Sequence, residues 1–423
     1  MNKLKSIIVV GYNGSRVMDI AKLRSIASAR YDAQLILLVE TLSHRDHLVA
    51  DQVVQISFAP SELDSAVKQM QEHLSDGPQI IGVLPFSDRG VLLGAALATL
   101  FSLPGITPAE ARAGLDKQVL RSLEISHAEA PATYDSVLSY PVDNLENLIQ
   151  RVKGMGGRAF IKPTCEGASR GCQVIERVER CASAWNALEP YHASGIIVET
   201  LVTDAREYSW DYVAGRSWIT EKTTTEGAYR AEIQQIVPAP LARSDAQRVE
   251  VAGEHIRCIV APCNGAYHNE IFFKDDRRTS AVETNMRPAG MHIWDLARHA
   301  FTDFDPWQTW VRWAVEGYRD HRPLIARGYC GIRLLSATED GVLISLPNIA
   351  HLAHALDIEI IDSAYTKEPG DSVSTVVVDN MGFIGHVIVF DTDAKRLQTQ
   401  LLQLAESVQA NISIGQQFLA REA

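Results

Sequence analysis

The stretch of residues 263–292 constrains the fold most strongly, because it has the pattern of a β-hairpin whose strands carry charged side chains. Two apolar runs, residues 266–273 and 279–286, flank the polar cluster of residues 274–278. Two such runs around a short polar segment are typical of antiparallel strands joined by a turn. A turn centred in this cluster sets the register of the two strands.

The predicted register gathers four polar side chains on one face of the hairpin. It places Glu270 opposite Glu283. It also places His268 opposite Asn285, and side chains two residues apart on a strand share a face. Opposed carboxylates repel each other, so a cation should lie between them, and a divalent ion with oxygen ligands is the natural candidate. The alternative is a solvated hairpin with surface charges, which the apolar neighbours in both strands disfavour.

This hairpin resembles the metal-binding and arginine motif of ATP-grasp enzymes, in which a glutamate is followed by the pattern Glu-x-Asn-x-Arg. Here the motif reads Glu270, then Glu283, Asn285 and Arg287. The resemblance implies that ATP and Mg²⁺, with Mn²⁺ as a substitute, are the cofactors. It also implies that the two glutamates and Asn285 ligate the metal. Arg287 would be the catalytic residue that stabilises charge on the transferred phosphoryl group.

Two lysines and a small-residue loop continue the resemblance in the family's order. Lys117 opens a helix, Lys162 lies near the end of a short strand, and residues 164–171 form a small polar loop before the next strand. By the resemblance, both lysines contact the α- and β-phosphates and the loop closes over the β- and γ-phosphates. The loop residues that we expect to bind ATP are Gly167, Ser169 and Gly171. The pattern alone also fits an ordinary hairpin loop.

The strand of residues 196–202 resembles the hinge strand of the family. The resemblance implies that Glu199 and the backbone near Leu201 receive the adenine amino group, and that Glu207 binds the ribose. The alternative for Glu207 is a surface charge at a strand end. Candidate substrate contacts are His268, Arg287, Gly290 and Met291, and for His268 a structural role is an equal alternative.

The order of patterns predicts four units, 1–112, 113–195, 196–320 and 321–423. The first alternates strands and helices, which indicates a parallel sheet covered by helices. The second contains the glycine-rich flap, and the third contains the hairpin. The fold class is therefore α/β and α+β, and the resemblance implies an ATP-grasp fold with an N-terminal parallel α/β domain and a β-rich C-terminal extension.

The last two units also give local predictions. Trp307, Trp310 and Trp313 recur at helical spacing, which favours core packing over a ligand site. In the C-terminal unit we expect residues 329–335 to pair with residues 342–346. We also expect residues 376–378 to pair with residues 384–390.

Composition limits the partners. A formal net charge of −12 argues against nucleic acid or an anionic membrane as the main partner. The N-terminal apolar run is too short for a signal peptide, and the six cysteines have no zinc-site spacing. We therefore expect a cytoplasmic protein with reduced thiols that acts on small molecules. Whether it forms a homodimer is left open.

The residues after Arg287 indicate which group of ATP-grasp enzymes the sequence resembles most. Biotin-carboxylase-like enzymes continue with Gln-Val-Glu-His, whereas residues 288–292 read Pro-Ala-Gly-Met-His. The pattern is most similar to that of L-amino-acid ligases, which make dipeptides or related amides in small antibiotic pathways. The implied function is ATP-dependent joining of an amino-acid carboxylate to an amine. The alternatives are another carboxylate–amine ligase, such as one of nucleotide biosynthesis, and a non-catalytic ATP-binding regulator.

Overall fold

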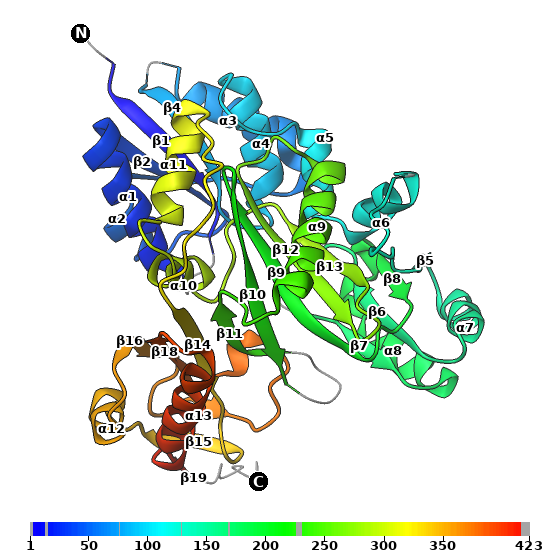
Figure 1. Cartoon of the computed structure of the whole chain (residues 1–423). Coiled ribbons are helices and arrows are strands. Elements are labelled where there is room, and N and C mark those ends of the chain that lie inside the picture. The colour runs from blue at the N-terminus through cyan, green and yellow to red at the C-terminus, as the bar shows by residue number, and fades with distance from the viewer. Residues whose placement is uncertain are drawn as a thin grey trace, which may run out of the picture.

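The N-terminal part of the chain forms a four-stranded parallel sheet, as predicted. The computed structural model describes residues 3–12, 16–75, 77–127, 129–167, 170–225 and 231–415. The strand order is β3-β2-β1-β4, and Figure 1 labels β1, β2 and β4 of this sheet. The strands are β1 (Lys5–Val10), β2 (Ala33–Val39), β3 (Gln52–Gln55) and β4 (Gln79–Pro85). The helices of this part are α1 (Val17–Tyr31), α2 (Asp46–Val49), α3 (Leu63–His73), α4 (Gly90–Leu100) and α5 (Pro108–Ala111).

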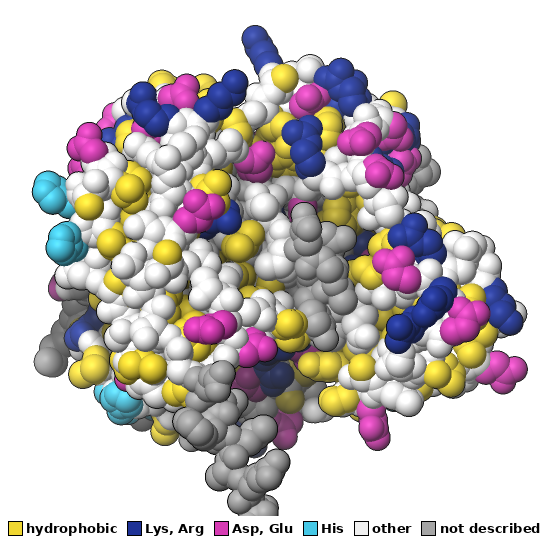
Figure 2. Space-filling model, turned by 90° about the horizontal axis from the view of Figure 1, so that it is seen from below, with side chains coloured by type: hydrophobic (Ala, Val, Ile, Leu, Met, Phe, Trp, Pro, Cys, Tyr) yellow, Lys and Arg dark blue, Asp and Glu magenta, His cyan; other side chains and the backbone are white. Residues whose placement is uncertain are grey.

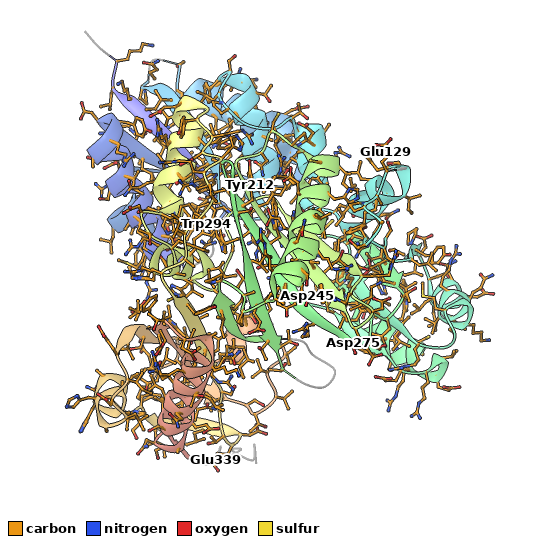
Figure 3. The ribbon with its side chains drawn as sticks, viewed as in Figure 1. Glu129, Tyr212, Asp245, Asp275, Trp294 and Glu339 are labelled. Atoms are coloured by element: carbon orange, nitrogen blue, oxygen red, sulfur yellow. The ribbon has the colours of Figure 1, made fainter. Side chains whose placement is uncertain are left out.

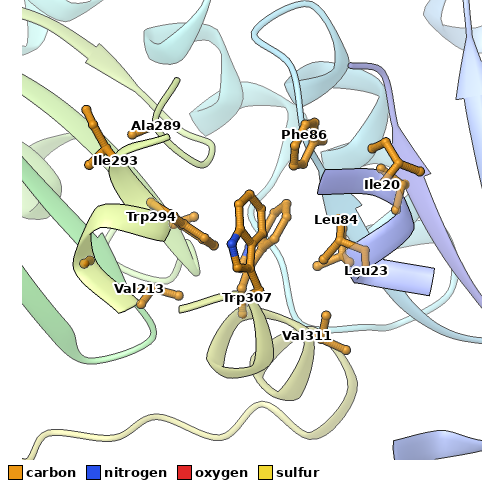
Figure 4. Close-up of a cluster of buried hydrophobic side chains, with 14 of the residues drawn as sticks. Ile20, Leu23, Leu84, Phe86, Val213, Ala289, Ile293, Trp294, Trp307 and Val311 are labelled. Atoms are coloured by element: carbon orange, nitrogen blue, oxygen red, sulfur yellow. The ribbon is translucent and has the colours of Figure 1, made fainter. Parts of the chain in front are cut away.

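The two faces of this sheet belong to different hydrophobic cores. Ile8 and Val10 pack with α3 and α4, whereas Ile7 and Val9 pack with α1 and with a cluster of tryptophans. Four of the five tryptophans come from α10 (Ile293–Ala300) and α11 (Pro306–Glu316), and the fifth is Trp218. Figure 4 shows Trp307 of α11 between Trp294 and Leu84. The predicted core role of the three tryptophans of α11 is confirmed, since each is at most 3% exposed.

A second, smaller sheet has the order β5-β8-β6-β7. Its strands are β5 (Ser139–Val142), β6 (Ala159–Pro163), β7 (Gln173–Ile175) and β8 (Ile196–Glu199), and the helices are α6 (Lys117–Ser126), α7 (Leu145–Gly154) and α8 (Cys181–Ala187). β6 and β7 are antiparallel, which confirms the two strands of the predicted flap. Gly171, where the loop returns, has φ +71°, and a Cβ there would lie 2.8 Å from Cγ of Pro163. Glycine is therefore needed at this position.

The central sheet has eight antiparallel strands in the order β13-β12-β9-β10-β11-β14-β18-β16. From the middle of the chain come β9 (Ala205–Val213), β10 (Arg216–Thr224), β11 (Glu232–Val237), β12 (Ala266–Lys274) and β13 (Thr279–Asn285). Helix α9 (Arg243–Val260) packs against β12 and β13. In Figure 3, Asp275 marks the β12–β13 turn and Asp245 the start of α9. Nε of Arg277 donates to Oδ1 of Asp245 at 3.0 Å and so ties the turn to the helix.

The predicted register of the hairpin is confirmed where the polar residues lie. Glu270 pairs with Glu283, and His268 pairs with Asn285. Beyond Glu270 the register shifts by one residue, because Val282 forms a β-bulge. The shift leaves the carbonyl oxygen of Val282 free to accept hydrogen bonds from other parts of the chain.

Both predicted hairpins of the C-terminal part are wrong. β14 (Tyr329–Leu335) pairs with β11 and β18 (Gly385–Asp391), and β18 pairs with β16 (Ile360–Tyr365), so these strands extend the central sheet. β15 (Gly341–Ser345) instead pairs with β17 (Ser372–Val373) and β19 (Ser413–Gly415), while residues 376–378 form no strand. Helix α12 (Ile349–Ala355) flanks this part, and α13 (Ala394–Ala410) covers β14 and β18. Three of the four predicted strands are present, as β14, β15 and β18, but their partners are other strands than predicted.

Three general features accompany this fold. Within the described residues, no helix combines the length and apolar character that crossing a membrane requires. All six cysteines are free. On the face shown in Figure 2, basic and acidic side chains lie interspersed.

Candidate active site

A band of polar side chains crosses one face of the central sheet. The pairing of Glu270 with both Glu283 and Ser209 carries the band from β13 to β9, and the pairing of Lys222 with both Glu207 and Gln235 carries it on to β11. Paired residues of antiparallel strands point to the same face. The sheet thus places residues from five strands beside one another.

His268 joins two carboxylates of this band. Its Nδ1 lies 2.7 Å from Oδ1 of Asp211, and its Nε2 lies 3.2 Å from Oε1 of Glu270. Asp211 also accepts hydrogen bonds from the hydroxyls of Ser209 and Thr220, both at 2.7 Å. Burial lowers the pKa of the imidazole, but Asp211 and Glu270 outweigh it and raise the pKa of His268 to about 9. His268 is therefore a cation at neutral pH, held in place on both sides.

Glu270 has one oxygen occupied by cations of the chain. Its Oε1 receives Nζ of Lys222 at 2.5 Å as well as the imidazole. Burial raises the pKa of Glu270, but Lys222 and His268 reverse this and hold it below its usual range. Within the described part of the chain, Oε2 of Glu270 accepts no hydrogen bond. An ionised carboxylate with a free oxygen fits a metal ligand.

Glu283 and Asn285, the other predicted metal ligands, lie beside Glu270 and contact each other. Nδ2 of Asn285 donates to Oε1 of Glu283 at 3.1 Å, and Oε2 of Glu283 lies 2.9 Å from Nζ of Lys117. Lys117 begins α6, whose N-cap is Asp116, and it also donates to the backbone oxygen of Glu166 in the flap loop. One predicted phosphate-binding lysine thus touches both the predicted metal site and the loop. The residues fit a magnesium–nucleotide complex, because the metal ligands offer oxygens and a cation lies beside them.

Lys162 is held by Glu199 and by the β-bulge. Its Nζ lies 2.8 Å from Oε2 of Glu199 and donates to the carbonyl oxygen of Val282 at 3.3 Å. Oε1 of Glu199 receives Nε of Arg121 at 2.7 Å. Arg121 also donates to the carbonyl oxygen of Val282 at 3.0 Å. The side chain of Glu199 is thus bound to two cations, while its predicted contact with adenine stays a prediction.

Arg287 contacts the N-terminal part of the chain. Its Nε and Nη2 donate to the two oxygens of Asp88 at 2.7 and 2.9 Å, and its Nη1 donates to the carbonyl oxygen of Pro288 at 3.0 Å. Arg16 donates to the same carbonyl at 3.3 Å. Asp88 follows β4, and a Cβ on Gly167 would lie 3.6 Å from its Oδ2. The N-terminal domain, the flap loop and the catalytic candidate therefore meet at Asp88.

Glu207 belongs to the same polar band, and its carboxylate lies 3.0 Å from Nζ of Lys222. Burial raises the pKa of Glu207, and Lys222 offsets part of this increase. Leu201 follows β8 and is half-buried. Ser169 lies outside the described residues. The predicted roles of these residues toward the nucleotide stay predictions.

The loop after Arg287 reaches towards β11 and the C-terminal part. Met291 has φ +46° and its sulfur lies 3.5 Å from Nε2 of Gln235 and 3.7 Å from Nδ2 of Asn380. Around Gly290 a Cβ would meet no atom within 4 Å, so space is open at this point. These two predicted substrate residues therefore lie at the same edge of the band as Gln235.

Sequence reasoning missed several charged residues of the site. They are Asp88, Arg121, Asp211, Lys222 and Glu232. For Lys222 a signal existed, because it shares the strand parity of Trp218 and Thr220, which predicts an inward-facing side chain. Asp88 and Arg121 carry no comparable pattern, since their partners are far away in the sequence.

Neither a family model nor a curated protein matches this sequence. Solved structures do match the fold. An L-amino acid ligase from Bacillus licheniformis superposes with a TM-score of 0.80 at 13% identity, over 99% of this chain and 100% of that chain. The chain has the ATP-grasp fold.

Two further structures support this assignment of the ATP-grasp fold. An N5-carboxyaminoimidazole synthetase from Staphylococcus aureus, complexed with ADP, has a TM-score of 0.69 at 15% identity and covers 96% of this chain and 99% of its own. A biotin carboxylase domain from Hydrogenobacter thermophilus, in complex with MgADP, ADP and bicarbonate, has a TM-score of 0.64 at 14% identity and covers 98% and 91%. At these identities the likeness establishes the fold.

Proposed function

We propose that the protein is an ATP-dependent carboxylate–amine ligase of the L-amino-acid ligase type. It transfers the γ-phosphoryl group of ATP to the carboxylate of an amino acid. The amine of a second amino acid attacks the acylphosphate, and ADP and phosphate leave. The observation that carries the proposal is the meeting of two predicted sets of residues, with Lys117 of the phosphate-binding set 2.9 Å from Glu283 of the metal-binding set.

The residues of the chain divide the work in this proposal. Glu270, Glu283 and Asn285 would hold Mg²⁺, which would neutralise part of the phosphate charge of ATP. Lys117 releases Glu283 and Lys162 releases Glu199, and both lysines then bind phosphate oxygens of ATP. Arg287 releases Asp88 and then stabilises the negative charge that develops on the transferred phosphoryl group.

An alternative ligase activity has its own support. The N5-carboxyaminoimidazole synthetase from Staphylococcus aureus also spans nearly the whole chain, although its TM-score is lower than that of the amino acid ligase. The second candidate is therefore a carboxylate–amine ligase that acts on a nucleotide precursor. A non-catalytic regulator is disfavoured, because the metal-ligand set and Arg287 are all present and close together.

One experiment separates these candidates. Phosphate release from ATP is measured with a panel of amino acids, singly and in pairs, and with a phosphoribosyl-linked amine or imidazole as the competing substrate. We expect release that depends on Mg²⁺ and on a pair of amino acids, with ADP as the nucleotide product. Release only with the phosphoribosyl compound favours the alternative, and AMP with pyrophosphate contradicts both.

A further inference from the structure

Lys222 lies in the centre of the polar band, and the proposed chemistry leaves it without a role. Its side chain is 0% exposed. Its Nζ contacts one carboxylate on each of three strands: Glu207 of β9 at 3.0 Å, Glu270 of β12 at 2.5 Å, and Glu232 of β11. A buried ammonium with three carboxylate partners is a local cation site in its own right.

The three carboxylates resemble a metal site whose ion is replaced by the ammonium group. One oxygen from each of Glu207, Glu232 and Glu270 lies within 4.8 Å of the others. These three residues are half-buried, and carboxylates this close repel each other unless a cation lies between them. The ammonium group of lysine has three N–H donors, which match the three acceptors in number. Lys222 therefore supplies the cation that this arrangement requires.

The ammonium group also fixes which oxygen of Glu270 and of Glu232 stays available for other contacts. Lys222 and His268 both bind Oε1 of Glu270, which leaves Oε2 of Glu270 without a hydrogen bond in the described part of the chain. Glu232 uses its other oxygen to accept Nε2 of Gln235 at 2.6 Å. Lys222 thus orients Glu207, a candidate for nucleotide binding, and Glu270, a candidate metal ligand. It also orients Glu232, which lies beside Gln235 and the predicted substrate loop.

We propose that Lys222 is a positioning residue that occupies a three-carboxylate cation site and keeps divalent ions out of it. A metal ion is thereby restricted to the side of Glu270 that faces Glu283 and Asn285. The direction of the metal towards Glu283 rests on the proposed function. The occupation of the carboxylate site by Lys222 does not, and it is tested without nucleotide or substrate.

The test is calorimetric titration of the full chain with Mn²⁺ alone. Lys222→Met keeps an unbranched side chain, one atom shorter than that of lysine, and removes its charge, so we expect it to bind one more Mn²⁺ per chain than the wild type. Lys222→Arg, which keeps a cation, should bind the wild-type number. Adding Glu232→Gln to Lys222→Met should abolish the extra ion. Lys274→Met, which removes a lysine bound to Asp135 outside the band, is the matched control and should bind the wild-type number.

A folded Lys222→Met variant with the wild-type Mn²⁺ stoichiometry would overturn the proposal. If this variant does not fold without metal, thermal unfolding is followed with increasing Mn²⁺. A ligand that binds only the folded state stabilises it, so Mn²⁺ should restore folding of Lys222→Met and shift the wild type much less. Failure of Mn²⁺ to restore folding would likewise refute the proposal, whichever reaction the enzyme catalyses.

Discussion

The two halves of the site carry opposite charges. The small sheet and α6 contribute the cations Lys117, Arg121 and Lys162, together with two buried carboxylates, Glu124 and Glu199. The central sheet contributes mainly carboxylates: Glu207, Asp211, Glu232, Glu270 and Glu283. The halves meet where Lys117 contacts Glu283 and where Lys162 donates to the carbonyl oxygen of Val282.

This difference in charge is the basis for the ligand that we propose for each half. The lysines on the small-sheet side have carboxylate partners that phosphate oxygens can replace. The carboxylates of the central sheet lie on neighbouring strands, so their spacing is fixed by backbone pairing. Changes on the small sheet should therefore alter nucleotide affinity, and changes on the central sheet should alter the metal requirement.

Arg287 tests this division most severely, because it is a cation on the carboxylate side whose ion-pair partner, Asp88, belongs to the N-terminal part of the chain. Arg287→Ala should lower turnover by roughly 10²–10³-fold, as removal of one donor to a developing oxyanion does. Nucleotide affinity should change little, since the arginine is needed chiefly in the transition state. Single-turnover phosphoryl transfer and nucleotide calorimetry measure the two effects.

The matched control is Arg278→Ala, which removes an arginine from the turn of the same hairpin, where it binds Asp135. It should keep near-normal turnover. If Arg287→Ala also keeps near-normal turnover at saturating substrate, Arg287 has no role in the transition state.

Glu283→Gln should raise the Mg²⁺ concentration needed for half-maximal activity by at least about tenfold. Tenfold is the lower limit of the affinity loss when a residue that only supports a metal ligand is mutated. The amide keeps the size of the side chain but removes the charge that attracts the ion. Activity is measured against Mg²⁺ at fixed ATP. An unchanged Mg²⁺ dependence would remove Glu283 from the metal site.

Lys162→Ala should weaken ATP binding roughly tenfold, which corresponds to about 1.5 kcal/mol for one hydrogen bond to a charged group. Its Mg²⁺ dependence should stay close to that of the wild type. Lys153→Ala, an exposed lysine on α7 of the same unit, is the control. Equal ATP affinities for Lys162→Ala and this control would show that Lys162 serves only Glu199.

The smallest expected effect is a pH dependence of folding stability that comes from Glu199 of the small sheet. Burial raises the pKa of Glu199, but Arg121 and Lys162 outweigh it and lower the pKa to about 2 from the ordinary 4.5. The folded state therefore gains stability from Glu199 above pH 4.5, and this gain is lost as the pH falls towards 2. The stability difference between wild type and Glu199→Gln should shrink by about 1.4 kcal/mol per pH unit in this range.

Urea unfolding of both proteins between pH 5 and pH 3.5 measures this difference in stability. A gap that stays constant over this range would mean that Glu199 titrates normally and that its two cations do not hold it ionised.

The sequence predicts the hairpin well and the rest of the site only in part. The alternation of apolar and polar residues in β12 and β13 is sufficient for the register of Glu270 and Glu283, because both strands and their turn are local. It cannot predict that β14 pairs with β11, or that Asp88 binds Arg287, since these contacts depend on how distant elements pack. The charge of Lys222 was visible, but its three partners lie on strands whose pairing no local pattern specifies.

The most direct measurement of the central claim follows the oxygen atoms of the substrate. An amino acid labelled with ¹⁸O in its carboxylate is incubated with ATP, Mg²⁺ and a second amino acid, and the released phosphate is analysed by mass spectrometry. Attack of the carboxylate on the γ-phosphorus and expulsion by the amine leave one labelled oxygen in each phosphate, with ADP as the other product. Unlabelled phosphate, or label in AMP, would contradict an acylphosphate intermediate and with it the proposed role of Arg287.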